Sequence, residues 1–395
     1  MSYGNGSITA RKRQPGEKNG AWLVTLDLGR DPQTGQRRRR RFTVHGTRRD
    51  AQRALREALQ KRDRGMLLPA GSPSVGEWLT RWLARHQSEG HIGPRAHDRY
   101  QGIIRRHLLP ALGRLHLQDL RPDHIGDLKA RWLSGNRSTA DAPLSGASVF
   151  KHLVVLRQAL DDAMKAGLIA RNPVAAVSSP SVKASAERRA LTEEEITALL
   201  SRASGTRYDA PIRFTLATGV RQGEVLALTW ADIDLDAGTV DVRRTLCYVG
   251  GKVAFLPPKT DHSRRTIELS AATVQLLSAH RVAQMEHRLR LGSVWQDNDL
   301  MFPSRIGTPW LPRLFYRDYR PIVDGSGIVH PETTNWHTLR HTAASQWLRH
   351  GADVFSVSRR LGHASAAFTM DVYAHLLKGQ QRVAAEALDY LLAQA

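Results

Sequence analysis

The spacing of apolar residues changes twice along this chain, each time at a segment rich in proline, glycine or serine. These segments are residues 67–73 and 178–189. Proline and glycine interrupt regular structure, and polar stretches between patterned segments are typical of interdomain connections. A chain of 395 residues is long enough for two or three packed domains. The breaks therefore predict three domains, over residues 1–66, 74–178 and 190–395.

Apolar and polar residues alternate in the first domain, which is the pattern of a half-buried β-strand. Trp22, Val24 and Leu26 stand at every second position, and the alternation resumes at Phe42 and Val44 after a turn. Helical spacing then follows a threonine that can cap a helix. We expect a three-stranded antiparallel sheet with one helix.

A run of arginines falls within the later of these alternating stretches: Arg37, Arg38, Arg39, Arg40 and Arg41. Successive side chains of a strand point to opposite faces, so the run places positive charge on both faces of the sheet. A buried sheet does not tolerate this arrangement, whereas a sheet laid into a DNA groove uses it. A charge run exposed to solvent is the alternative interpretation.

The second domain has the apolar spacing of α-helices throughout. Trp78, Leu79 and Trp82 form one helix face, and further helical patterns cover residues 96–109 and 147–166. We therefore expect an all-helical domain. Its surface is expected to carry arginines suited to gripping DNA phosphates, with solvated helix faces as the alternative. These residues are Arg95, Arg99, Arg105 and Arg106.

The third domain is mainly helical, with one interruption by strands. Thr192 and Glu195 form a capping-box pattern that opens its first helix. Between residues 235 and 269, alternating stretches around the Gly250–Gly251 pair predict a three-stranded meander. The whole chain is thus expected to be mainly α with small antiparallel β-sheets, an α+β protein whose third domain mixes helices and a sheet.

The charge balance of the chain points to a polyanionic partner. Lysine and arginine number 58 against 37 aspartate and glutamate, which gives a formal net charge of +21. Nucleic acid is the first candidate and an anionic membrane surface the second. The sequence has no apolar stretch of about 18 residues, as a membrane span requires, and no apolar segment follows the basic residues 11–13. We expect no membrane association and a cytoplasmic protein.

Several segments of the third domain carry side chains suited to phosphate chemistry. Arg221 follows Gly219 at the start of a helix, where a guanidinium, free amide groups and the helix dipole together favour a phosphate. His337 and Arg340 are one helical turn apart, so a histidine and a second guanidinium can converge. His363 follows a short helix in a Leu-Gly-His turn.

Two more residues complete the candidate set. Tyr373 comes ten residues after His363, and Lys259 lies between two predicted strands, where it can reach into a cleft as a proton donor. A tyrosine hydroxyl has a pKa of about 10, so a nucleophilic tyrosine needs nearby cations and a stabilised phosphoryl target. Singly, these residues are a core tyrosine, a turn histidine and a solvated hairpin lysine. Only their combination indicates catalysis.

In order and spacing, the set resembles the tyrosine recombinase (phage integrase) family. The matching segments are Ala-Thr-Gly-Val-Arg221, Lys259 on its hairpin, His337-x-x-Arg340, Leu-Gly-His363 and the late Tyr373. By this resemblance, residues 190–395 would form the catalytic domain and residues 74–178 a helical domain that binds the core DNA site. Residues 1–66 would form an arm-type DNA-binding domain.

The resemblance implies a site-specific DNA recombinase, the integrase of a phage or another mobile element. Arg221 and Arg340 would clamp the scissile phosphate. Tyr373 would attack it and form a 3′-phosphotyrosine, while Lys259 protonates the departing 5′ oxygen and the two histidines of the set assist. Glu224 would have a structural role, and His341 lies outside the set.

Further implications concern cofactors and partners. The phosphodiester is exchanged for a phosphotyrosine ester and back, so no ATP and no metal or other cofactor is implied. The implied partners are double-stranded DNA attachment sites, a homo-tetramer assembled on two sites, and accessory proteins that set direction or bend DNA. Residues 380–395 show an apolar helical stripe that packs either on a neighbouring protomer or on its own domain.

Two other functional classes stay open at this stage. A DNA-binding regulator could retain the fold without catalysis. A metal-dependent nuclease or transposase would need clustered carboxylates, and no suitable trio is evident in the sequence. His337 and His341 have the spacing of two zinc ligands, but Thr338 stands where a zinc protease has glutamate.

Overall fold

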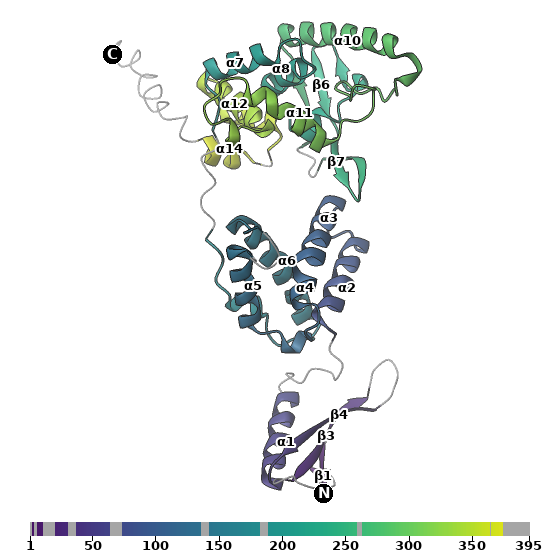
Figure 1. The fold of residues 1–395 in the computed structure, drawn as a ribbon, viewed down its shortest axis with the longest axis vertical. Coiled ribbons are helices and arrows are strands. Elements are labelled where there is room, and N and C mark those ends of the chain that lie inside the picture. The colour runs from purple at the N-terminus through teal and green to yellow at the C-terminus, as the bar shows by residue number, and fades with distance from the viewer. Residues whose placement is uncertain are drawn as a thin grey trace, which may run out of the picture. The chain divides into compact units, whose positions relative to one another are not determined.

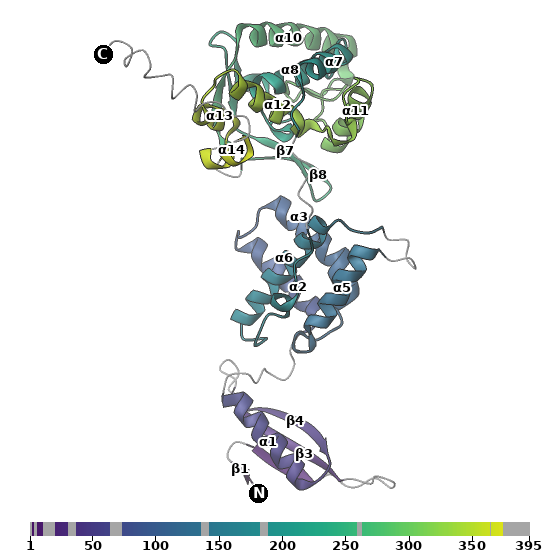
Figure 2. The same cartoon turned by 90° about the vertical axis from the view of Figure 1, so that its left-hand side faces the viewer.

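The computed structural model describes most of the chain: residues 2–3, 6–10, 20–30, 37–63, 73–135, 142–181, 189–258, 263–363 and 365–373. It divides into two compact units, Met1–Lys183 and Ala184–Ala395. Helices predominate in it, and every strand pairing is antiparallel (Figures 1 and 2). The predicted class, mainly α with small antiparallel sheets, is confirmed.

The first unit begins with a sheet in which four strands lie in chain order. Its elements are β1 (Ser2–Tyr3), β2 (Gly6–Ala10), β3 (Ala21–Arg30), β4 (Arg37–His45) and helix α1 (Arg48–Asp63). Val24 and Leu26 of β3 pack against Ala51 and Leu55 of α1, and all four are buried. The expected sheet is present with β1 added, a strand of two residues that is too short to show a periodicity.

The arginine run lies on β4, on a strand that α1 covers from one side. Arg41 is paired with Thr25 of β3, and Arg39 is paired with Asp27. Thr25 lies between the buried Val24 and Leu26, and Asp27 follows Leu26. Because side chains alternate along a strand, Arg39 and Arg41 therefore lie on the face that α1 does not cover. Both are exposed, as is Arg37, which forms an ion pair with Asp27 at 2.8 Å. The side chains of Arg38 and Arg40 lie outside the described part of the chain.

The rest of the first unit is helical, as predicted (Figure 2). Its elements are α2 (Val75–Ser88), α3 (Pro94–Ile103), a π-helical turn (Ile104–Leu108), α4 (Leu109–Leu112), α5 (Pro122–Ser134) and α6 (Gly146–Lys165). Trp78 and Trp82 of α2 are buried, and their indole nitrogens donate to the Ala159 carbonyl at 2.7 Å and to Asp162 at 2.9 Å. These bonds join α2 to α6.

The second unit carries helices around a small sheet. Its helices are α7 (Glu193–Ala203), α8 (Asp209–Thr218), α9 (Gln222–Val225), α10 (Ala271–Leu291), α11 (Pro312–Asp324), α12 (Trp336–Arg349), α13 (Val354–Leu361) and α14 (Ala366–Tyr373). Thr192 caps α7 in the predicted capping box with Glu195. None of the described helices combines the length and apolar character that crossing a membrane needs.

The strands of the second unit correct one prediction. They are β5 (Ile233–Asp234), β6 (Thr239–Val242), β7 (Thr245–Val249), β8 (Lys252–Leu256) and β9 (Arg265–Glu268). The predicted meander is wrong, because β6 pairs directly with β9 and the β7–β8 hairpin forms a sheet of its own. Val240 and Ile267 are paired partners in one core cluster, whereas Leu246 of β7 packs in another.

We predict that Leu156→Ala destabilises the first unit by about 2–5 kcal/mol, because it leaves a cavity at a fully buried position of the helical core. Urea unfolding of the full chain, followed by tryptophan fluorescence, measures this loss. The matched control is Leu133→Ala, because the Leu133 side chain is 39% exposed. Equal unfolding free energies for the two variants would contradict the assignment of this core.

Candidate active site

Arg221 is presented by a tight turn between α8 and α9. Gly219 ends α8 with a φ of 66°, a left-handed conformation that favours glycine. A Cβ atom there would lie 2.7 Å from Leu361 Cδ2, so the turn packs closely on the end of α13. Arg221 also donates to the Gly362 carbonyl at 3.1 Å. The local sequence thus brings Arg221 to the turn that carries His363.

Glu224 holds Arg221 in this position and is itself held by a second arginine. Its carboxylate accepts from Arg221 at 2.7 Å and from Arg265 of β9 at 3.0 Å, and its side chain is 4% exposed. Burial raises the pKa of Glu224, but the charges of Arg265 and Arg221 and their hydrogen bonds outweigh burial and leave the pKa below its ordinary value. Glu224 is therefore a buried anion that orients two cations, as the expected structural role requires.

Arg340 is the most deeply buried arginine of the site, with 2% exposure. Its two terminal nitrogens donate to the Gly219 and Leu361 carbonyls, both at 2.8 Å. Burial, and then the charge of Arg221, lower its pKa to about 9, so it still carries its charge at neutral pH. These bonds engage two of the guanidinium's five N–H groups, one on each terminal nitrogen.

His363 follows the left-handed Gly362 that ends α13. Its Nδ1 lies 2.7 Å from the Thr369 hydroxyl of α14. Burial, and then the charges of Arg340 and Arg221, lower its pKa to about 3. His363 is therefore a neutral imidazole at physiological pH, able to share a hydrogen bond with a phosphate oxygen.

Tyr373 ends α14 and lies inside the site. It is 3% exposed and packs against Ala344, Leu348 and Leu361. Its hydroxyl is 2.7 Å from Nδ1 of His341, a residue of α12 that is itself 7% exposed. The sequence analysis did not place His341 in the candidate set. The feature that could have identified it is its position directly after Arg340.

The structure brings together most of the predicted set. Arg221, Arg340 and His363 meet at the turns that end α8 and α13, and Tyr373 packs with Leu361 at the second of these turns. His337 is exposed near the start of α12, and the centroid of its ring is 4.6 Å from the centroid of the His341 ring. Lys259 falls between β8 and β9, outside the described residues. Arg265 was missed, because its pairing with Glu224 links positions far apart in the sequence.

Basic side chains also surround a hollow beside the catalytic set. It has a volume of about 700 Å³, and its lining includes Arg264, Arg265, Arg359, Arg360 and His363. A concave surface with this charge attracts a phosphate backbone. The predicted phosphate contacts Arg95, Arg99, Arg105 and Arg106 belong to the other unit and are all exposed, on α3 and the π-helical turn.

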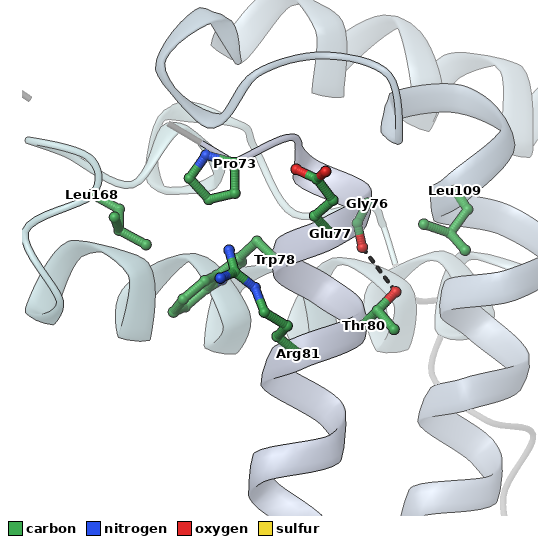
Figure 3. Close-up of a pocket in the computed structure, with 8 residues that line it drawn as sticks. All are labelled: Pro73, Gly76, Glu77, Trp78, Thr80, Arg81, Leu109 and Leu168. Atoms are coloured by element: carbon green, nitrogen blue, oxygen red, sulfur yellow. Dashed lines mark hydrogen bonds between the residues drawn. The ribbon is translucent and has the colours of Figure 1, made fainter. Parts of the chain in front are cut away.

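A larger hollow, of about 800 Å³, lies in the first unit and contains none of the predicted site residues (Figure 3). Trp78 and Arg81 of α2 line it together with Leu109 and Leu168, and Thr80 donates to the Gly76 carbonyl at 2.9 Å. Glu77, also in its lining, forms a capping box with Ser74. Most of the residues that line this hollow belong to the first turns of α2.

The histidines with the spacing of zinc ligands have other contacts. Nδ1 of His341 lies beside the Tyr373 hydroxyl, and neither His337 nor His341 belongs to a group of described residues that could hold a metal. Within the described residues, one compact group could hold a metal: His86, Glu89 and His91, in the first unit. An ion pair of His91 with Glu89 at 3.3 Å, and of His86 with Asp162 at 3.4 Å, accounts for that group.

Comparison with known proteins agrees with this geometry. Residues 189–380 match the sequence profile of the phage integrase family, and residues 74–133 match the phage integrase N-terminal SAM-like domain. An integrase of Streptomyces ambofaciens is 31% identical over 372 residues, which cover 90% of each chain. The chain belongs to the phage integrase family.

Solved structures of integrases share the fold of this family member. The Tn1549 transposon integrase in complex with a circular intermediate DNA superposes with a TM-score of 0.66 at 18% identity, covering 80% of this chain and 100% of that one. A lambda integrase tetramer bound to a Holliday junction gives a TM-score of 0.53 at 20% identity, covering 90% and 96%. The chain is a site-specific DNA recombinase, an enzyme that exchanges DNA strands by transesterification.

We predict that Glu224→Gln lowers the unfolding free energy of the recombinase by about 3–5 kcal/mol, because it leaves the buried Arg265 and the partly exposed Arg221 without their counter-charge. The pH dependence should change as well. A carboxylate whose pKa is depressed by folding stabilises above its unfolded pKa, about 4.3, and loses that contribution as pH falls through the folded value. Acid unfolding should therefore be shallower in the variant.

The matched control for this prediction is Glu286→Gln, which removes an exposed carboxylate paired with Arg290 at 3.9 Å on α10. Equilibrium denaturation of all three proteins between pH 3 and pH 7 compares the two changes. Equal unfolding free energies for the Glu224 and Glu286 variants at every pH would show that the ion pairs of Glu224 do not stabilise the site.

Proposed function

We propose that this recombinase acts as the integrase of a phage or another mobile element, and that it cuts and rejoins DNA through a 3′-phosphotyrosine on Tyr373. The observation that carries the proposal is the position of Tyr373 beside the turn that ends α13. Tyr373 packs with Leu361, whose carbonyl accepts from Arg340. The carbonyl of the next residue, Gly362, accepts from Arg221. Two guanidinium groups beside a nucleophile are what phosphoryl transfer needs, because they stabilise the charge that develops on the phosphate oxygens.

The two arginines would hold the scissile phosphate in a fixed orientation. Bonds to Glu224 and to the Gly362 carbonyl fix Arg221, and bonds to two turn carbonyls fix Arg340. Because both guanidiniums are oriented before DNA arrives, little reorganisation is needed in the transition state. Neutral His363 would add a hydrogen bond to the same phosphate.

The proton transfers would follow the direction of the reaction. When Tyr373 attacks the phosphorus, the departing 5′ oxygen needs a proton, and Lys259 is the proposed donor, with His337 assisting at the exposed side of the site. When a partner strand's 5′ hydroxyl attacks the phosphotyrosine, the same groups act in reverse. Bond energy is retained in the ester, so we propose that the reaction needs neither ATP nor a metal cofactor.

DNA would be held by several parts of the chain. We propose residues 74–178 as the core-site domain, with contacts from its exposed arginines on α3 and the π-helical turn, among them Arg95, Arg99 and Arg106. We propose residues 1–66 as the arm-type domain, in which Arg37, Arg39 and Arg41 face away from α1. Exposed arginines on an uncovered sheet face support contact with a DNA groove.

The active assembly is proposed to be a homo-tetramer on two DNA sites. The fold shared with lambda integrase supports this proposal, since that protein forms a tetramer bound to a Holliday junction. The substrates would be double-stranded attachment sites, and accessory proteins would set direction or bend the DNA between them. The reaction would take place in the cytoplasm, where DNA of this kind is accessible.

We expect a covalent protein–DNA adduct when the wild type is incubated with a nicked core-site DNA in EDTA without ATP. Tyr373→Phe should form none, because it lacks the attacking oxygen, although it should bind the DNA with unchanged affinity. Denaturing electrophoresis detects the adduct. Bound DNA without any adduct in the wild type would favour a regulator that retains the fold, and loss of the adduct in EDTA alone would favour metal-dependent chemistry.

We further expect the triple change of Arg95, Arg99 and Arg106 to Ala to weaken core-site binding and reduce its salt dependence. Each DNA phosphate that the variant no longer neutralises should lower the slope of log K against log salt by about 0.9, so the slope should fall by about 2–3. The control changes Arg281, Arg288 and Arg290 of α10 to Ala, which removes the same charge from exposed positions elsewhere. Equal slopes for the two triple variants would refute the assigned DNA face.

A further inference from the structure

His341 contacts the oxygen that the proposed function makes the nucleophile. Its Nδ1 lies 2.7 Å from Tyr373 Oη. His341 follows Arg340 on α12, whereas Tyr373 is the last residue of α14, so the contact depends on the fold and not on a local motif. The proposed mechanism assigns this histidine no role, although it is as deeply buried as the tyrosine.

We propose that His341 Nδ1 accepts the phenolic proton of Tyr373 during strand cleavage, an inference that rests on the proposed function. A general base must lie within hydrogen-bond distance of the proton that it removes, and 2.7 Å between Nδ1 and Oη meets this condition. Tyr373 is 3% exposed, so bulk water is a poor acceptor for its proton. A side chain that already contacts Oη supplies the acceptor.

The proton and the bonds balance in both directions. In cleavage, the Oη–H bond breaks, the proton moves to Nδ1, the Oη–P bond forms and the P–O5′ bond breaks. The departing 5′ oxygen takes its proton from Lys259, the proposed donor. In rejoining, a 5′ hydroxyl attacks the phosphorus, the tyrosine oxygen departs, and His341 returns the proton to it. No oxidant, reductant or further reactant is needed.

The surroundings of His341 suit this role. Positive charges near Oη stabilise the negative charge that develops there as the proton leaves. His337 contacts the His341 ring, and Arg340 precedes it on the same helix. His341 is also within electrostatic reach of His363, on which the charges of Arg221 and Arg265 act as well. The same cations make proton uptake by His341 less favourable, so its protonation must be coupled to the attack of Oη on the phosphate.

Two substitutions separate proton transfer from mere contact. His341→Asn places an amide where Nδ1 stood and keeps a hydrogen bond to Oη, but it cannot take up a proton. His341→Phe fills the ring volume without that bond. We expect both to lower the single-turnover cleavage rate of nicked core-site DNA by about 100-fold or more at pH 7, with DNA affinity and melting temperature close to wild type. An Asn variant that cleaves at the wild-type rate would overturn the proposal.

The pH profile gives a readout that a structural role would not change. In His341→Asn the phenolic proton must pass to solvent hydroxide, so the cleavage rate should rise about tenfold per pH unit between pH 7 and pH 9. Lys259→Ala, which lacks the proposed proton donor, should gain nothing from higher pH. An Asn profile parallel to that of the wild type would show that His341 only packs against the tyrosine, and would refute its role as the base.

The same experiment separates this inference from the function on which it rests. Wild-type cleavage that depends on Tyr373, together with an active Asn variant, removes the role of His341 and leaves the phosphotyrosine mechanism in place. A wild type that binds DNA but never forms an adduct removes both. If the Phe variant does not fold, the Asn variant alone decides, because asparagine is smaller than histidine and retains the polar contact.

Discussion

The catalytic unit depends on the buried guanidinium of Arg340. Two chain turns that are distant in sequence, one after α8 and one after α13, each direct a carbonyl to it at 2.8 Å. Those turns carry Arg221 and His363. Removing the guanidinium from between them would leave two buried carbonyls without their donors and release both side chains, because a buried acceptor without a partner costs about 1–3 kcal/mol. One side chain therefore supports the fold and borders the proposed reaction centre.

The charged side chains of the site carry an excess of positive charge, which a bound phosphate can offset. Arg221, Arg265 and Arg340 lie within electrostatic reach of one another, and Glu224 is the carboxylate that balances them. One anion against three cations leaves positive charge in excess. Burial, and then the charges of Arg340 and Arg221, lower the pKa of His363 and keep it neutral. A DNA phosphodiester entering this site, with its single negative charge, would offset part of the excess.

The parts of the site that sequence could predict are those carried by local motifs. Arg221 and His363 follow glycines whose left-handed turns could be anticipated, and the one-turn spacing of His337 and Arg340 required a helix there. The hydrogen bond between His341 and Tyr373 could not be predicted, since nothing local relates α12 to the end of α14. The pairing of Glu224 with Arg265 likewise needs β9 to lie against the start of α9.

The sheet shows the same limit of sequence reasoning. Alternation predicted strands over residues 239–242 and 266–269, and the structure has β6 at 239–242 and β9 at 265–268. Alternation carries no information on which strand is the neighbour. The structure pairs them directly, because Val240 and Ile267 share one core, and excludes the intervening hairpin, whose Leu246 packs in another. At the start of the chain, β1 has two residues and therefore no periodicity to detect. Partner choice in a sheet is decided by tertiary packing.

The central claim is that one phosphate is bound by the two fixed arginines and joined to Tyr373. The most direct measurement is an experimental structure of the recombinase trapped on a nicked core site. The account predicts continuous density from Tyr373 Oη to a 3′ phosphate whose non-bridging oxygens contact Arg221 and Arg340. A trapped phosphate that lies away from either arginine, or a DNA end joined to another side chain, would contradict it.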